Sequence, residues 1–217
     1  MKKIISYSLY GTDEKYTIGL KRNIDLLDDV FPGWIIRVYY DDSISEEVLD
    51  RSNPSVEYIK IKNDNNYMFW RFYAWDDPDV DIFISRDVDD RLNRHDFSMI
   101  SEWEKSSYGF TVARSPFAGG AHNIPMLGGM WGGKPKCYNI KMRDLIEKFK
   151  THHTTTQRGD DQFFLITYIW PLVASSTQSY GSKFNYECAD HKDLPIESRI
   201  GGAYDAHIKT SEEYWNA

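Results

Sequence analysis

The alternation of strand-like and helix-like patterns over the first ninety residues constrains the fold more than any other feature of this sequence. The patterns follow one another as strand, helix, strand, strand, helix, strand. We predict strands over 3–11, 34–42, 56–62 and 80–86, and helices over 16–31 and 66–75. This order favours a mostly parallel, Rossmann-like α/β sheet with helices on its faces, in which ligands bind beyond the carboxyl ends of the strands.

The second half of the chain has a more mixed pattern. Apolar spacing predicts helices over 93–106, 140–153 and 160–170, and strands over 108–114 and 126–134. We expect Pro171 to end the last helix, and we assign no element in the polar segment 177–217. Because no linker separates the halves, we predict one α/β domain over 1–217: a mixed sheet flanked by helices, with a nucleotide-binding half (1–91) and a second half (92–217).

Composition excludes some classes of partner and location. The 217 residues carry a net charge of −7 with no basic stripe that would neutralise phosphates, so we expect no nucleic-acid partner. Cys137 and Cys188 form no Cys-x-x-Cys pair, which is typical of reduced thiols in a cytoplasmic protein. No apolar run approaches the ~20 residues of a membrane span, and we see no signal peptide. We therefore predict a soluble intracellular protein, or one domain of a longer chain.

Acidic residues gather where the predicted strand 80–86 ends. The Asp-x-Asp pattern occurs three times in this region, at Asp77/Asp79, Asp79/Asp81 and Asp87/Asp89. Only Asp87 and Asp89 directly follow a predicted buried strand. Two carboxylates so close repel each other unless a cation neutralises them, and Mg²⁺ or Mn²⁺ takes such oxygens together with substrate phosphates. We predict a metal and diphosphate site here; the simpler alternative is that these side chains cap turns and the next helix.

The surrounding sequence resembles GT-A-fold nucleotide-sugar glycosyltransferases, and in particular small bacterial and large-virus (chlorella-virus-like) glycosyltransferase domains. The resemblance is carried by four blocks in this order: MFWRFYAWDDPDVDIFISRDVDDRL, VARSPFAGGAHNIPMLGGMWGGK, GDDQFFL and LPIESRIGGAYDA. It covers roughly 3–206 and implies a GT-A-like fold whose second half holds sugar and acceptor. It also implies transfer of a hexosyl or deoxyhexosyl group from a nucleotide-diphosphate donor, UDP-sugar by analogy, to a glycan or other hydroxyl acceptor, in the cytoplasm (the host cytoplasm if the protein is viral).

On the donor side, the resemblance implies that Asp87 and Asp89 hold Mn²⁺ or Mg²⁺ against the donor diphosphate, with Asp87 also able to reach the ribose. The turn at the end of the first strand would contact the nucleoside. Arg71 would pair with a phosphate or orient an Asp of the cluster, unless it is simply a cation on a helix surface. The remaining nucleotide-side candidates are Ser8, Leu9, Tyr10 and Tyr16.

On the acceptor side, the resemblance implies that Arg114 and His122 lie where sugar and acceptor meet, and that His191 is a third metal ligand, although a surface role is the simpler alternative for His191. Trp131, between two Gly-Gly pairs, would stack on the sugar or lie in a glycine-rich strand crossing. The segment GDDQFFL has two interpretations. Asp160 and Asp161 open a helix, or one of them, preferably Asp161, is the general base that deprotonates the acceptor hydroxyl.

Several mechanistic questions stay open at this level. Attack helped by Asp161 would invert the anomeric configuration, whereas help from a phosphate oxygen would retain it. A haloacid-dehalogenase-like phosphatase also needs Asp-x-Asp at a strand end, but its nucleophile strand usually comes first in the chain. A non-catalytic sugar-binding module is the other alternative, since the aromatic content of 15% fits either a sugar-binding surface or an aromatic core.

Overall fold

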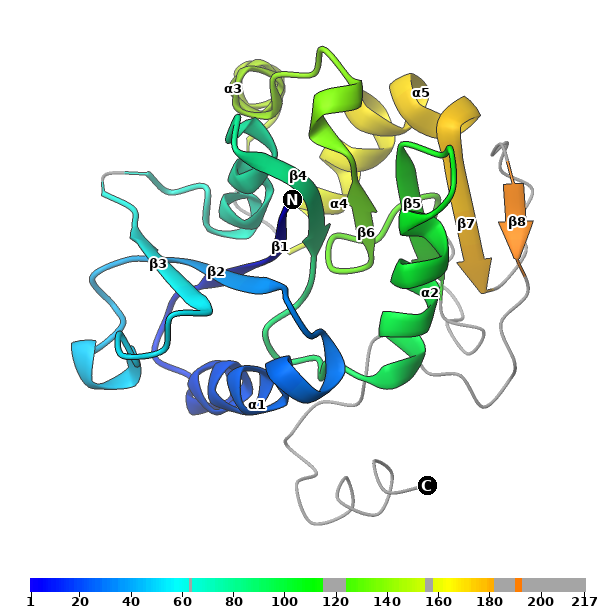
Figure 1. Cartoon of the computed structure of the whole chain (residues 1–217). Coiled ribbons are helices and arrows are strands. Elements are labelled where there is room, and N and C mark those ends of the chain that lie inside the picture. Colours follow the sequence, from blue (N-terminus) through cyan, green and yellow to red (C-terminus); the bar gives the residue numbers. More distant parts are fainter. Residues whose placement is uncertain (63, 115–123, 155–157, 182–189, 193–217) are drawn as a thin grey trace.

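An eight-stranded sheet organises the protein (Figure 1), with strand order β3-β2-β1-β4-β6-β5-β7-β8. The computed structural model describes residues 1–62, 64–114, 124–154, 158–181 and 190–192. The strands are β1 (Lys2–Leu9), β2 (Ile35–Tyr40), β3 (Val56–Lys60), β4 (Val80–Ser85), β5 (Phe110–Arg114), β6 (Trp131–Gly133), β7 (Thr177–Gly181) and β8 (Asp190–Lys192). Among them only β6 runs antiparallel to its neighbours, β4 and β5. The predicted mixed α/β sheet is therefore confirmed.

Helices cover both faces of this sheet. Helices α1 (Glu14–Val30) and α2 (Arg94–Glu104) pack on one face. The other face carries the 3-10 helix η2 (Tyr67–Asp76), then α3 (Met142–His152) and α4 (Asp160–Phe164), with the π-helical turn η5 (Leu165–Ile169) and α5 (Trp170–Val173) following α4 without a break. The short 3-10 helices η1 (Glu46–Val48), η4 (Pro135–Cys137) and η6 (Ala174–Ser176) lie in connections. No described helix has the length and apolar character needed to cross a bilayer.

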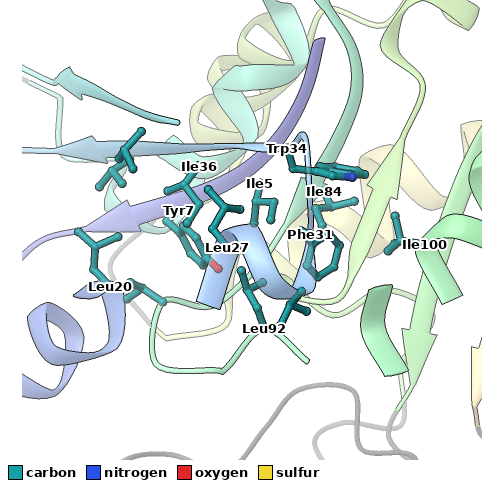
Figure 2. Packing of buried hydrophobic residues seen from close by; sticks show 14 of the residues in the cluster. Ile5, Tyr7, Leu20, Leu27, Phe31, Trp34, Ile36, Ile84, Leu92 and Ile100 are labelled. Carbon is teal, nitrogen blue, oxygen red and sulfur yellow. The ribbon is translucent and has the colours of Figure 1, made fainter. Parts of the chain in front are cut away.

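Alternate side chains of β1 enter two separate cores, as the period of two in a strand requires. Ile5 and Tyr7 pack with Leu27 of α1 and Ile100 of α2, and Figure 2 shows these side chains together beneath the sheet. Ile4 lies on the opposite face, in the cluster formed with η2, α3 and α4. Strands β1 and β4 are buried on both faces. Because they pair in parallel, their carboxyl ends lie side by side at one edge of the sheet.

Aromatic side chains fill most of the second core. The ring of Trp131 stacks with Phe110 at 5.8 Å between ring centroids, and it meets Phe83 edge-on at 4.9 Å. Trp131 is 0% exposed. The prediction that it stacks on a sugar is therefore not supported, because neither face of the indole is open to a ligand. The simpler interpretation of the aromatic composition, an aromatic core, explains this tryptophan.

The structure corrects three sequence-based assignments. The strand predicted over 126–134 shrinks to β6. The last helix continues through Pro171 into α5, because the preceding π-helical turn leaves Pro171 at the start of a new α-helical segment, where its missing N–H needs no partner. The polar segment after it contains the buried strand β7, in which Thr177 donates to the Val173 carbonyl at 2.7 Å and Gln178 donates to Asp190 at 2.8 Å.

Replacing Trp131 tests whether its ring belongs to the core. Trp131→Ala should lower the free energy of unfolding by about 3–5 kcal/mol, because it leaves a large cavity among aromatic rings, whereas Trp131→Phe should cost less. Urea unfolding followed by circular dichroism measures both values. A Trp131→Ala variant that loses less than about 1 kcal/mol would contradict this placement.

Candidate active site at the carboxyl edge of β1 and β4

The acidic loop, which we define as residues 87–90, follows β4 directly. Asp87, Asp89 and Asp90 are each half-buried. Because Ser6 of β1 pairs in register with Ser85 of β4, the loop begins beside the end of β1. The structure therefore places the predicted Asp pair at the sheet edge where ligands bind in folds of this type.

Helix α1 fixes the backbone of this loop. The side-chain amide of Asn23 donates to the carbonyl of Val88 at 3.2 Å and to that of Asp90 at 2.8 Å, and its oxygen accepts from the N–H of Leu92 at 3.1 Å. Asn23 is 0% exposed. One turn earlier, any side chain at Gly19 would collide with the Val88 carbonyl. The loop is thus held by three hydrogen bonds with Asn23 and by close backbone contact at Gly19. No sequence motif predicts this arrangement.

The loop concentrates negative charge. Burial and the neighbouring Asp87 carboxylate raise the pKa of Asp89. Burial together with Asp87 and Asp89 raises the pKa of Asp90 well above its ordinary value. Lys15 and Arg91 oppose the shift of Asp89 without cancelling it. Carboxylates that resist ionisation together in this way fit a divalent cation, which would neutralise them.

The carboxylates of this loop are the candidate ligands for such a cation. In the described part of the chain, no three His, Cys, Asp or Glu side chains form a group arranged to hold a metal. Two carboxylates completed by substrate phosphates and water would suit Mg²⁺ or Mn²⁺. The backbone of His191 lies in β8, four strands away from β4 across the sheet, or about 19 Å at ordinary strand spacing. The structure therefore does not bring the predicted third ligand to the loop.

Arg71 connects the acidic loop to two other parts of the site. Its guanidinium pairs with Asp87 through Nη1 and with Asp161 through Nη2, the second pair at 2.7 Å. Its backbone N–H donates to the Ser8 hydroxyl at 3.0 Å. Arg71 is 8% exposed, so the alternative that it is a surface cation is wrong. The ion pair with Asp87 fits the other alternative, that Arg71 orients an Asp of the cluster, which stays a prediction.

Asp161 faces this arginine from the first turn of α4. Its carboxylate is 3% exposed. Burial raises the pKa of Asp161, and the charge of Arg71 opposes that shift. Asp160, one residue earlier, is only half-buried and lies where a helix N-terminus favours negative charge. Of the two carboxylates, the structure therefore brings Asp161 into the network around Asp87.

Two glycines allow the network to form. A Cβ at Gly128 would collide with the Asp161 carboxylate and with Arg71. A Cβ at Gly129 would collide with the carboxylate of Asp87. The glycine-rich segment before β6 thus approaches protein carboxylates closely. What the backbone of this segment approaches is the Arg71 network.

The nucleotide-side candidates lie near the end of β1, where they have different surroundings. Tyr10 contacts Tyr67 at 5.0 Å and Trp70 at 5.9 Å between ring centroids. Leu9 is 0% exposed in the core, so only its backbone could meet a ligand. Tyr16 is half-buried in α1, with the Lys15 ammonium 4.4 Å from the centre of its ring.

The structure does not bring the predicted acceptor-side residues together in one site. Arg114 is buried, donates to the Pro125 carbonyl at 3.2 and 2.9 Å, and lies 5.6 Å from the centre of the Trp170 ring. His122 lies outside the described residues.

One charged pair was not predicted from the sequence: Arg86, just before the acidic loop, forms a two-point ion pair with Asp96 at 2.8 and 2.7 Å. Only the residue types, not their spacing, hint at that pair.

Comparison with known proteins supports the fold. A scan against protein-family models and a search of curated proteins both gave no match. Among solved structures, the glycosyltransferase GlyE of Streptococcus pneumoniae TIGR4 superposes with a TM-score of 0.56 at 17% identity, covering 82% of this chain and 45% of GlyE. A glycosyltransferase involved in glycosylation of the major capsid of PBCV-1 gives 0.52 at 12% identity, with 82% and 81% covered.

A third structure shares the fold but has a different activity. The 4-diphosphocytidyl-2C-methyl-D-erythritol synthase of Anaerococcus prevotii gives a TM-score of 0.54 at 10% identity, with 100% of this chain and 97% of the synthase covered. The chain spans less than half the length of the GlyE chains. At these identities the likeness shows the fold: this is the predicted GT-A-like, Rossmann-type arrangement, found in glycosyltransferases and in a nucleotidyl-transferring enzyme alike.

Replacing Arg71 tests how much its ion pairs contribute to the stability of the fold. Arg71→Met should destabilise the protein by about 3–5 kcal/mol, because it leaves Asp161 as a buried, unpaired charge. The loss should be larger at pH 7 than at pH 5: without Arg71 the folded-state pKa of Asp161 rises further above its unfolded value, so stability falls as pH rises. Urea unfolding at the two pH values measures this.

The matched control for this measurement is the double variant Arg71→Met/Asp161→Leu. It removes both charges and should regain much of the lost stability and lose the extra pH dependence. A single variant as stable as the wild type at pH 7 would contradict the ion-pair network.

Proposed function

We propose that the protein is a metal-dependent glycosyltransferase that moves a sugar from a nucleotide-diphosphate donor, preferably a UDP-sugar, to a hydroxyl of a glycan or similar acceptor. The observation that carries this proposal is the acidic loop at the carboxyl edge of β1 and β4. It is held by Asn23 and Arg71, and burial together with the charge of Asp87 raises the pKa of Asp89 and Asp90. Such a loop in an acidic protein suits a ligand set of cation plus diphosphate.

In this proposal Asp87 and Asp89 hold Mn²⁺ or Mg²⁺. The bound ion would neutralise charge on the departing nucleoside diphosphate. Arg71 keeps one oxygen of Asp87 engaged, so the carboxylate has a fixed orientation before any ligand arrives. Pre-oriented carboxylates bind a cation without the entropic cost of ordering them at that moment.

We assign the carboxylates of the α4 turn different roles. Asp161, enclosed and bonded to Arg71, is best suited to position that arginine and, through it, Asp87. Asp160, less buried, is the better candidate for the base that takes the acceptor proton. His122 stays a prediction for the acceptor side. On the donor side we propose that Tyr10, with Tyr67 beside it, contacts the nucleoside.

A nucleotidyltransferase is the second candidate, since the synthase from Anaerococcus prevotii matches this chain over almost its whole length. The turn between β1 and α1 argues against it. A nucleoside triphosphate would bring more negative charge to this edge of the sheet. Where this turn enters α1, Lys15 stands beside Asp13 and Glu14, and the Lys15 ammonium lies 3.7 Å from the Asp13 carboxylate. A diphosphate with a metal is electrostatically better matched.

The phosphatase and sugar-binding alternatives are less well supported. The acidic loop follows β4, the fourth strand in the chain, whereas a dehalogenase-like nucleophile usually follows the first. Trp131, the aromatic residue predicted to stack on a sugar, belongs to the core. Neither of the two classes is among the similar structures described above.

Calorimetric titration of UDP tests the donor site. We expect UDP to bind in the presence of Mn²⁺, and Asp89→Asn to weaken that binding by about ten-fold or more, because a cation ligand is lost. Asp79→Asn is the matched control: it alters the exposed Asp79 of the other Asp-x-Asp patterns and should bind as the wild type does. If UDP binds equally well without metal, or equally well to Asp89→Asn, the proposed donor site is wrong.

Product analysis separates the two enzyme classes. With Mn²⁺ and a panel of UDP-sugars, we expect slow release of UDP even without acceptor, because water can replace the acceptor hydroxyl. With CTP and a sugar phosphate, we expect no pyrophosphate. Chromatography of the nucleotides detects both products. Pyrophosphate from CTP, with no UDP from any UDP-sugar, would favour the nucleotidyltransferase.

A further inference from the structure

A hollow lies at the opposite edge of the sheet from the acidic loop. It is an open groove of about 760 Å³, within the usual range for small-molecule sites. Its apolar lining includes Pro32, which is exposed, and Phe97 of α2, which is half-buried, together with the largely buried Trp34 and Ile82, the latter near the start of β4. Because Asp87 follows the end of β4, the groove and the acidic loop are separated by the length of that strand.

The groove carries positive charge in an otherwise acidic protein. Four lysines and two carboxylates line it, which leaves an excess of two positive charges, while the whole chain has a net charge of −7. The lysines are Lys3, Lys105, Lys134 and Lys136, and the carboxylates are Asp81 and Glu104. Local charge of this sign is not explained by the composition of the chain.

Both carboxylates already have partners. Lys3 pairs with Glu104 at 2.5 Å, and Lys136 pairs with Asp81 at 2.7 Å. The other oxygen of Asp81 accepts the backbone N–H of Lys2 at 2.7 Å. These pairs neutralise two of the four lysines, so the excess positive charge resides on Lys105 and Lys134.

Lys134 is held firmly in place. Its ammonium donates to the carbonyls of Ser106 at 2.7 Å and Trp103 at 3.4 Å, at the end of α2, and lies 5.2 Å from the centre of the Trp103 ring. In the part of the chain that the structure describes, no carboxylate forms an ion pair with it. Burial lowers the pKa of Lys134, and the nearby Glu104 and Cys137 oppose that shift only in part. An anionic ligand beside this ammonium would oppose it further.

We propose that this groove binds a small anion with an apolar part: a phosphate or carboxylate group on an aromatic or aliphatic body. The ammonium groups of Lys134 and Lys105 take the anionic group, and the apolar lining, in which Pro32 and Phe97 are the more exposed residues, takes the apolar body. The site is separate from the donor site at the other edge of the sheet, so its occupant is a second ligand.

Phenyl phosphate is a direct probe, because it joins an anion to a flat ring. Titration followed by amide NMR shifts should place its binding around Ile82, Phe97 and Lys134. Lys134→Met should weaken binding by about ten-fold, the value of one hydrogen bond to a charged group. Inorganic phosphate and phenol, each with half of the chemistry, should bind more weakly than phenyl phosphate.

Control variants keep the proposal falsifiable. Lys105→Gln changes an exposed side chain, should leave the fold intact and should also weaken binding. Lys148→Met removes the same charge from the exposed surface of α3 and should change nothing. The proposal is overturned if phenyl phosphate does not bind, if Lys105→Gln and Lys134→Met bind it as the wild type does, or if UDP with Mn²⁺ displaces it.

Discussion

The buried ion-pair network around Arg71 is the interaction on which the rest of the site depends. The guanidinium of Arg71 contacts Asp87 beyond β4 and Asp161 in α4, and the backbone N–H of Arg71 donates to the hydroxyl of Ser8 in β1. These residues come from distant parts of the sequence, and an enclosed arginine of this kind is costly unless each partner is present. Glycines at 128 and 129 provide the space. The network therefore fixes Asp87 in direction and couples the two halves of the chain.

The acidic loop beside this network holds carboxylates whose charges repel one another. Asp89 and Asp90 raise the free energy of the ionised loop, as their raised pKa values indicate, while Asn23 and the close contact at Gly19 prevent the loop from relaxing away. Strain of this electrostatic kind is relieved by binding a cation. This unfavourable charge lies at a strand end where ligands bind in such folds. It is therefore a physical reason to propose a metal and diphosphate site there, independent of any resemblance.

Sequence patterns predicted much of the fold and only part of the site. Helix α1 and strands β1 to β4 follow from apolar periodicity, and Asp87 and Asp89 from their position after a buried strand. Strand β7 was missed because its buried residues are polar and satisfied by hydrogen bonds, such as Thr177 to Val173. The Arg71–Asp161 pair joins residues ninety positions apart, and the anchoring of the loop by Asn23 depends on the packing of α1, so neither leaves a local signal.

The most direct test of this account is a crystal structure of the protein with UDP and Mn²⁺, with diffraction data collected at the manganese absorption edge. The account predicts an anomalous peak between the UDP diphosphate and the carboxylates of Asp87 or Asp89, with Asp161 still bonded to Arg71. UDP bound elsewhere, or bound at this edge of the sheet with no manganese at the acidic loop, would contradict it.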